Sequence, residues 1–233
     1  MRDAPDMDGG FHGFAPDVFA WFAGLERENS KAYFTETRER YETKVRGGLA
    51  AMLEELSAAF GGDVRVFRQQ RDLRFTADKS PYKIRTYGVL QGVPGARAGL
   101  YAQLSARGLY AGTGYHHLRP DQLERFRTAV ADDRSGPALA AAAAAAQDAG
   151  IELAGECIRT APRGYTRDHP RIGLLRRKAL IAGSALAGAG GIGRMAALEH
   201  VAGAWRAAAP LNAWLDEHVG PSELALEERS RRR

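Results

Sequence analysis

A strand-rich stretch between two helical blocks is the feature that most limits how this chain of 233 residues can fold. The stretch holds short apolar segments at 64–67, 86–90, 100–104 and 108–112, and the last two flank Ser105-Ala106-Arg107, which predicts a hairpin. Strands joined by short turns are typical of a mostly antiparallel sheet. Helices on either side of such a block favour an α+β architecture over repeated βαβ units. We therefore expect a single α+β domain with helices flanking a mostly antiparallel sheet.

Proline, glycine and capping residues mark the ends of the expected helices. Pro16 suits the first position of a helix, and Asn29 or Ser30 can cap the next one. We expect this second helix to be interrupted at Gly47-Gly48 and to end at Gly61-Gly62. For the second block the sequence predicts helices at 121–131, after Pro137, at 171–178, at 192–208 and at 211–219, with short strands at 157–160 and 179–182.

The length fits one domain, which we place at residues 11–220, between a flexible start at 1–10 and a basic tail at 221–233. The single cysteine, Cys157, excludes an internal disulfide and a CxxC metal site, and we expect it to pack in a strand. The first ten residues lack a secretory pattern, and the alanine-rich run is too weakly apolar to span a bilayer. These features predict a cytoplasmic protein that makes no contact with a membrane.

A cationic stretch is the strongest chemical feature of the sequence. The whole chain has a formal net charge of +5 and a pI near 9.5, which suits anionic ligands. Within the stretch, six cations against two carboxylates give a local charge of +4. The cations are Arg68, Arg71, Arg74, Lys79, Lys83 and Arg85, and the carboxylates are Asp72 and Asp78. Arginine suits carboxylates, phosphates and sulfates because its planar fork donates two parallel hydrogen bonds.

Three explanations of the cationic stretch remain open. The cations can form a site for a small anion, or a lattice of salt bridges with the aspartates and with glutamates of the first helices. The third explanation, a nucleic-acid surface, is the weakest, because the chain has no zinc-finger spacing, RNA-recognition signature or helix-turn-helix. The sequence also lacks the phosphate-binding motifs GxxxxGK[ST] and GxGxxG on a strand, so we expect no nucleotide cofactor and no other organic cofactor.

Three segments together resemble a bacterial family known as domain of unknown function 2461. They run from Gly13 to Tyr41, from Phe67 to Lys83, and from Pro162 to Lys178, and the second contains the distinctive run Arg71-Asp72-Leu73-Arg74. The resemblance covers roughly residues 11–215 and implies that the cationic motif is the family hallmark. Gln70, Ile84 and Arg85 depart from the family pattern, which indicates a divergent, specialised member of actinobacterial type. The resemblance further implies a place in specialised metabolism, because similar proteins occur in aziridine-forming pathways.

The leading hypothesis is therefore a cofactor-independent enzyme that acts on a small anionic substrate. Arg/Lys clamps stabilise negative charge on a departing oxygen, so elimination of sulfate or phosphate by an internal amine is a natural reaction class. Asp72 or Asp78 would orient the amine, and Tyr82 would donate a hydrogen bond nearby. The cations named above, together with Arg163 of the third segment, would hold the anion. The alternative is a non-catalytic module that binds an anion, a protein partner or nucleic acid, with a homo-oligomer also open.

Histidines offer less support for chemistry. His116 and His117 follow a glycine-rich segment and can supply a general acid or base, although a loop or surface position is the simpler reading. No HxH or HExxH spacing occurs, so we predict no metal site.

Overall fold

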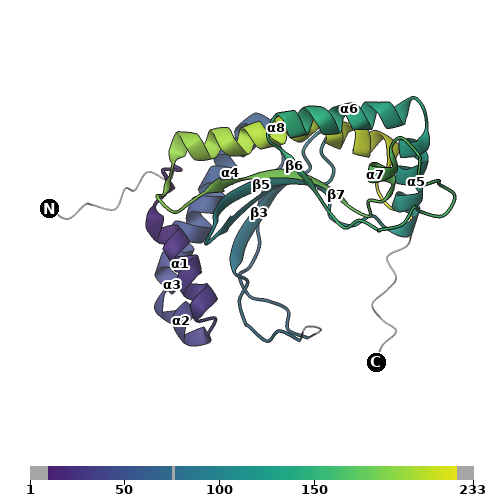
Figure 1. Ribbon diagram of the computed structural model, residues 1–233. Helices are drawn as coiled ribbons and strands as arrows, with labels where there is room; N and C mark the ends of the chain where they lie inside the picture. The colour runs from purple at the N-terminus through teal and green to yellow at the C-terminus, as the bar shows by residue number, and fades with distance from the viewer. Residues whose placement is uncertain (1–9, 75–76, 225–233) are drawn as a thin grey trace.

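The computed structural model describes residues 10–74 and 77–224 (Figure 1). Residues 1–9, Phe75, Thr76 and residues 225–233 lie outside the described part, and with them nearly all of the expected flexible start and most of the basic tail. In chain order the elements are β1 Gly13–Phe14, α1 Pro16–Arg27, α2 Lys31–Glu36, α3 Arg38–Arg40, the π-helix η1 Tyr41–Arg46, α4 Gly47–Phe60, β2 Asp63–Val66, β3 Arg85–Gln91, β4 Leu100–Ser105, β5 Gly108–Tyr115, α5 Pro120–Ala131, α6 Ser135–Asp148, β6 Glu152–Ala154, α7 Ile172–Leu175, β7 Leu180–Ala187, β8 Ile192–Gly193 and α8 Arg194–His218.

Six strands form one open, antiparallel sheet in the order β2-β3-β4-β5-β7-β6. The hairpin predicted around Ser105-Ala106-Arg107 joins β4 to β5, with Ser105 paired to Gly108. The short strands β1 and β8 form a separate antiparallel ribbon. The expected α+β class with a mostly antiparallel sheet is therefore confirmed.

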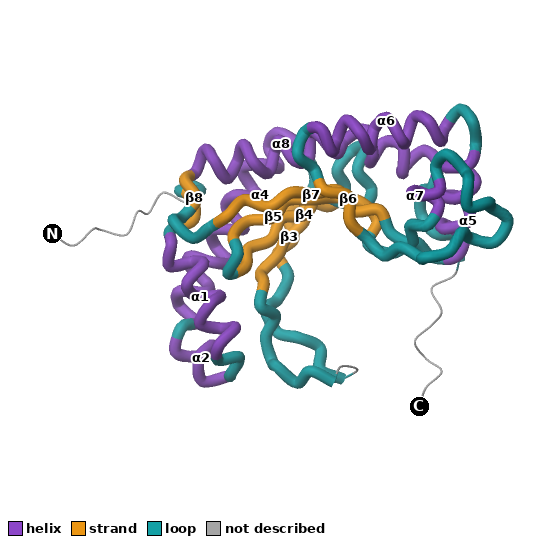
Figure 2. The backbone as a smooth tube through the Cα atoms, viewed as in Figure 1, coloured by secondary structure: helices purple, strands orange, loops and turns teal. Residues whose placement is uncertain are grey.

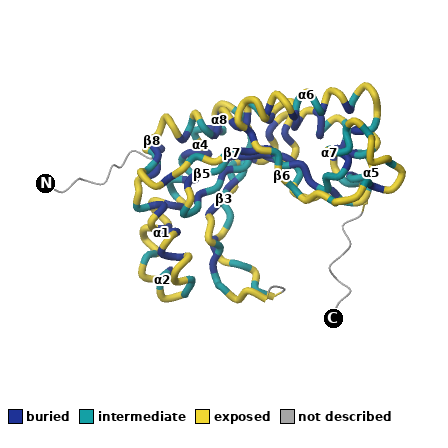
Figure 3. Tube along the Cα trace, in the orientation of Figure 1, coloured by how far each residue is buried: buried dark blue, intermediate teal, exposed yellow. Residues whose placement is uncertain are grey.

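Helices cover one face of this sheet. Helix α4 packs on β2 and β3, while α8 packs on β5 and β7, and Figure 2 shows α8 above the sheet together with α6. Leu90, Leu104 and Ala111 point toward these helices and are fully buried or nearly so. Their neighbours in each strand point to the opposite side, since side chains alternate along a strand. In β3 and β4 those neighbours are only partly buried or exposed (Figure 3).

The open face is the name used below for the side of the sheet that α4, α6 and α8 leave uncovered. The sheet arches, and the open face lies on the inside of the arch (Figure 1). Helices α1, α2 and α3 descend on one side of it, and α5 and α7 lie at the other end. The described part of the chain contains no helix with the length and hydropathy that crossing a bilayer requires.

An aromatic cluster ties the first helices together. Trp21, only 1% exposed, contacts the rings of Phe34 and Tyr41 at centroid distances of 6.2 and 5.2 Å. Its indole N–H donates to the hydroxyl of Thr37 at 2.8 Å, which satisfies the polar atom of this buried side chain. Ser30 caps α2 by accepting from the N–H of Tyr33 at 3.1 Å, as predicted.

Two predicted helix breaks do not occur. The helix containing Tyr41 continues through Gly47 and Gly48 into α4, and Gly48 instead allows the ring of Phe14 to lie 3.3 Å from where a Cβ would stand. The expected helices at 192–208 and 211–219 are one helix, α8, which runs through Pro210. Proline removes a single helix hydrogen bond, and buried apolar residues on both sides of Pro210 hold the helix against the sheet.

The segment after α6 also differs from the prediction. The strand is β6 rather than 157–160, where Cys157 makes only an isolated bridge to Arg177. Cys157 is exposed, so the expectation that it packs in a strand was wrong. The helix expected at 171–178 is limited to the four residues of α7, because the chain turns at Arg176 to enter β7.

Candidate functional site

Five of the six cations of the cationic stretch lie on a long loop that joins β2 to β3, and the sixth, Arg85, is the first residue of β3. This segment, residues 67–84, is called the cationic loop below. Its two limbs extend the strand ladder, since the N–H of Arg71 donates to the carbonyl of Pro81 and the N–H of Lys83 to the carbonyl of Gln69, both at 2.9 Å. An isolated bridge between Gln70 and Tyr82 continues the same pattern. The base of the loop is therefore built as regular backbone, while its tip projects from the sheet (Figure 2).

Asn29, in the turn between α1 and α2, fastens the loop to the helices. Its side-chain amide donates to the carbonyl of Tyr82, and its side-chain oxygen accepts from the N–H of Tyr82, each at 3.0 Å. The ring of Tyr82 stacks on Phe34 at 4.2 Å, and the residue is only 7% exposed. Tyr82 thus has a packing role, and the catalytic role predicted for it stays a prediction.

The buried side chain of Gln69 connects the two limbs of the loop at its base. This side chain is 1% exposed, and its oxygen accepts from the hydroxyl of Thr86 at 2.7 Å while its amide donates to the carbonyl of Lys83. A buried polar side chain needs such partners, because an unpaired amide in the interior is costly. These hydrogen bonds stabilise the base of the loop.

Two of the predicted anion ligands pair with the aspartates of the same loop. Arg74 forms a two-point contact with Asp72, with Nε–Oδ1 and Nη2–Oδ2 distances of 2.9 and 2.6 Å, and Arg71 donates to Asp78. These contacts hold the pKa of both aspartyl groups well below their usual range, as hydrogen bonds to the ionised form do. The salt-bridge explanation thus applies to Arg71 and Arg74, which pair with aspartates of the same loop.

A hollow of about 350 Å³ lies between the base of the loop and the α1–α2 turn. Five of the predicted site residues line it, together with Asn29, Ser80 and Ile84, and these five are Arg71, Asp78, Tyr82, Lys83 and Arg85. The structure thus brings half of the predicted set together.

The electrostatics of the hollow are cationic. Arg85 is exposed, and its guanidinium has no hydrogen bond or salt bridge to any residue in the described ranges 10–74 and 77–224. Lys83 donates to the carbonyl of Arg68 at 2.5 Å, and burial together with the charges of Arg68 and Arg85 lowers its pKa. Two adjacent cations with few carboxylate partners favour an anion bound between them.

The other predicted ligands lie outside the hollow. Arg68, Arg74, Lys79 and Asp72 do not line it, and the ammonium of Lys79 donates to the carbonyl of Leu73 at 3.1 Å. Arg163 is exposed on the loop that precedes α7, and it does not line the hollow either.

Two basic residues that follow Arg163 make contacts that stabilise the fold. Arg171 donates to the carbonyls of Val130 and Ala131 at 2.6 and 2.8 Å, at the end of α5. Lys178 pairs with Glu156 at 2.5 Å. Cationic groups at a helix C-terminus satisfy carbonyls that the helix leaves open, which accounts for the position of Arg171.

Sequence reasoning missed a row of aromatic side chains on the open face. Phe67 stacks on Tyr87 at 4.7 Å, Tyr87 lies 5.5 Å from Tyr101, and Tyr101 lies 6.2 Å from Tyr110 and 6.0 Å from His116. The pattern that signals this row is the alternation of each strand combined with the predicted hairpin register. That register places residues 101, 103 and 110 on one face, but it does not say which face the helices cover.

Burial affects the titration of the aromatic row. It raises the pKa of Tyr101 and Tyr110. It lowers the pKa of His116, and the nearby charge of Arg85 acts in the same direction. A lowered pKa favours the neutral imidazole at pH 7, which is the form that accepts a proton, although His116 does not line the hollow.

Metal-ligand groups are absent from the part of the chain that the structure describes, where no three His, Cys, Asp or Glu side chains converge.

Fold and site together define a single-domain α+β protein with a cationic hollow beside the open face of an antiparallel sheet. The chain belongs to the DUF2461 family of conserved hypothetical proteins, whose sequence profile matches residues 17–214. This confirms the family resemblance seen in the sequence. No functionally curated protein matches the chain.

Proposed function

We propose that this protein binds a small anionic molecule in the hollow beside the cationic loop and acts on it without an organic cofactor. The observation that carries the proposal is the position of Arg85 and Lys83 on one wall of that hollow, where Arg85 has no partner among the described residues. A guanidinium with its donors free can grip sulfate, phosphate or carboxylate through two parallel hydrogen bonds. The proposed location is the cytoplasm.

The hollow also offers polar groups for the rest of a substrate. Ser80 and Asn29 line it beside Asp78, which stays ionised because Arg71 and Ser80 donate hydrogen bonds to it. An ionised carboxylate can accept a hydrogen bond from a substrate amine and orient it. Its lowered pKa makes it a weak base, so orientation is the role that suits it.

The proposed reaction class is displacement of sulfate or phosphate by an amine of the same molecule. The amine lone pair forms the new C–N bond while the C–O bond breaks, and the oxyanion leaves with the bonding pair. The new ammonium group then loses one proton, to solvent or to His116. Arg85 and Lys83 would stabilise the charge that develops on the departing oxygen. A three-membered nitrogen ring is the product when the two groups sit on adjacent carbons.

The alternative is binding without turnover at the same hollow. Exposure favours this alternative, since Asp78 is 57% exposed and the hollow opens to water that would compete for charged groups. Turnover of a substrate distinguishes the two functions.

Binding is tested by isothermal titration calorimetry with inorganic sulfate. We expect Arg85→Ala to weaken binding about tenfold to a hundredfold, since one charge-assisted interaction is lost. The matched control is Arg97→Ala, because Arg97 is also exposed but lies in the loop after the far end of β3. Equal sulfate affinity in the wild type, Arg85→Ala and Arg97→Ala would refute the site.

Catalysis is tested by incubating the protein with a 2-aminoalkyl sulfate and measuring released sulfate by ion chromatography. We expect release above the uncatalysed rate, and a loss of that excess in Arg85→Ala but not in Arg97→Ala. Sulfate binding without any release would favour the non-catalytic alternative.

A further inference from the structure

The open face of the sheet carries side chains that the proposed anion site does not use. Phe67 directly follows β2, Tyr87, Tyr101 and Tyr110 lie in β3, β4 and β5, and each ring contacts the next. They are only partly buried, although apolar surface on a strand is normally covered by another layer. These four residues and His116 are called the aromatic row below.

The strand register explains why the rings meet. Tyr87 pairs with Gln103, and Gln103 pairs with Tyr110, so all three side chains point to the same face. Tyr101 pairs with Gly112 across β4 and β5, and its hydroxyl donates to the side-chain oxygen of Gln103 at 2.6 Å. This hydrogen bond holds the Tyr101 ring in one orientation.

Two glycines leave the open face without side chains next to Tyr110. A Cβ at Gly183 would stand 2.2 Å from the hydroxyl oxygen of Tyr110, and one at Gly112 would stand 2.9 Å from its ring. The two glycines pair directly across β5 and β7. The ring of Tyr110 therefore lies against bare backbone.

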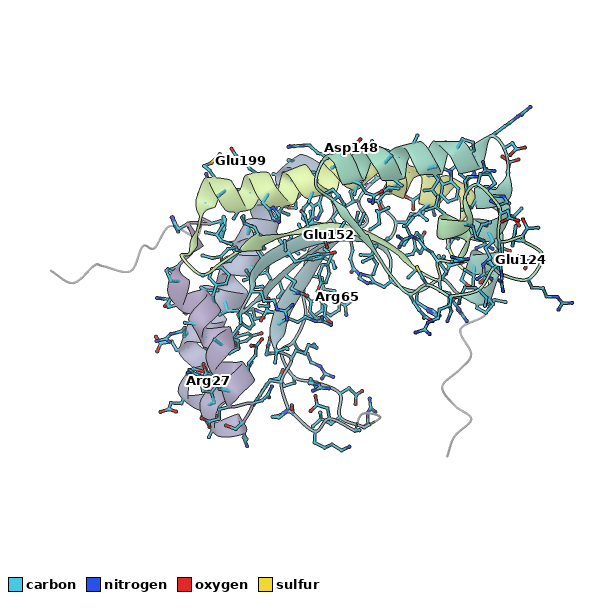
Figure 4. The ribbon with its side chains drawn as sticks, in the orientation of Figure 1. Arg27, Arg65, Glu124, Asp148, Glu152 and Glu199 are labelled. Atoms are coloured by element: carbon cyan, nitrogen blue, oxygen red, sulfur yellow. The ribbon has the colours of Figure 1, made fainter. Side chains whose placement is uncertain are left out.

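Cations border the aromatic row at the end nearest the hollow. The ammonium of Lys83 lies 5.1 Å from the ring centre of Tyr87, and the guanidinium of Arg65 lies 4.7 Å from that of Phe67. Arg85 is close enough to perturb the titration of both Tyr101 and His116. Glu152, on the other edge strand β6, carries the opposite charge near Tyr110, and Figure 4 shows it above Arg65 in this view.

We infer that the aromatic row binds a planar aromatic group of the same ligand whose anionic group lies between Lys83 and Arg85. The ligand class is thus an aryl-bearing sulfate, phosphate or carboxylate. This inference rests on the proposed anion site. The cations lie at one end of the aromatic row only, so charge complementarity places the anionic group of the ligand at that end and its ring over the tyrosines. Stacking of a ring on partly exposed tyrosines contributes affinity that depends little on the ring's substituents.

The experiment compares two probes of similar size on the wild-type protein. Phenyl sulfate and cyclohexyl sulfate carry the same anion, but only the first has a planar ring. We expect phenyl sulfate to bind roughly tenfold more tightly in calorimetry at constant ionic strength. Equal affinities of the two sulfates would overturn the inference while leaving the anion site intact. Failure of inorganic sulfate and of both esters to bind would refute the proposed function itself.

Variants of Tyr87 test whether the preference for phenyl sulfate arises at the aromatic row. Tyr87→Leu keeps an apolar side chain and should remove the preference for phenyl over cyclohexyl sulfate, whereas Tyr87→Phe should retain it. Phe60→Leu is the matched control, because the Phe60 ring packs on Trp205 at the helix-covered face. A preference unchanged in Tyr87→Leu would overturn the assignment to the aromatic row. The comparison of the two esters on the wild type needs no variant to fold.

A single strand of nucleic acid is the other ligand that stacks on aromatic side chains beside cations. An oligothymidylate that binds more tightly than phenyl sulfate, with an affinity that falls steeply with salt, would overturn the small-molecule assignment. Weak or absent binding of the oligonucleotide supports it.

Discussion

The clamp between Asn29 and Tyr82 is the contact on which the shape of the candidate site depends most directly. Asn29→Ala removes both of its hydrogen bonds, each 3.0 Å long, and leaves the N–H and the carbonyl of Tyr82 without these partners. An unsatisfied buried group costs about 1–3 kcal/mol. Since Asn29 borders an open hollow, water can reach part of the gap, and we expect a loss at the lower end, about 2 kcal/mol in total.

That loss translates into a measurable shift of the melting temperature. For a domain of this size, 1 kcal/mol corresponds to about 2–4 °C, so Asn29→Ala should lower Tm by roughly 4–8 °C. Calorimetric melting of the purified variant is the assay. Glu26→Ala is the control, because Glu26 is exposed on the neighbouring turn of α1 and should leave Tm unchanged.

Hydrogen exchange separates the clamp from a general loss of stability. The amide of Tyr82 should exchange much faster in Asn29→Ala, while amides of β5 should keep their protection relative to the global stability. An unchanged Tm together with unchanged exchange at residues 80–85 would refute the argument that Asn29 fastens the loop.

Two further predictions concern charge. Asp72→Asn should change Tm by less than about 2 °C, because the pair with Arg74 lies in water and the amide oxygen can still accept from the N–H of Arg74; a large drop in Tm would contradict this. If Asp72 nevertheless has the predicted role of orienting the amine, sulfate release from a 2-aminoalkyl sulfate should fall in the same variant. His200 is half-buried, with Nε2 3.3 Å from the carbonyl of Ser184, and burial lowers its pKa below the ordinary 6.5. The unfolded chain therefore binds more protons, so this contribution to stability is present above about pH 6.5 and is lost as the pH falls below it. Melting between pH 5 and 8 should show a weaker pH dependence in His200→Gln, and an identical profile would contradict the assignment.

Local signals in the sequence determined the elements that short-range chemistry controls. Pro16 opens α1, Ser30 caps α2 and Pro120 opens α5, because proline and hydroxyl side chains act on backbone within a few residues. The hairpin around Ser105-Ala106-Arg107 follows from the same kind of signal. Pro210 lies inside α8, where a local rule predicts a break, because packing of the helix on the sheet outweighs one missing hydrogen bond.

The sequence also located five of the eight residues that line the hollow, since the density of cations from Arg68 to Arg85 is visible without a structure. Only the tertiary structure distinguishes the cations that line the hollow from those that do not. Arg74 pairs with Asp72 and does not line the hollow, whereas Arg85 lines it with no partner in the described ranges. The spacing of charges along a loop does not fix which side each charge faces, because the loop is shaped by distant contacts such as that of Asn29.

The aromatic row could be recognised only from the tertiary structure. Tyr87, Tyr101 and Tyr110 are separated by loops, and they meet only because β3, β4 and β5 are neighbours in the sheet. Alternation along a strand distinguishes two faces but does not identify the one that helices cover. That choice was made by the docking of α4 and α8, which bury Leu90, Leu104 and Ala111 and so leave the tyrosines on the face that remains open.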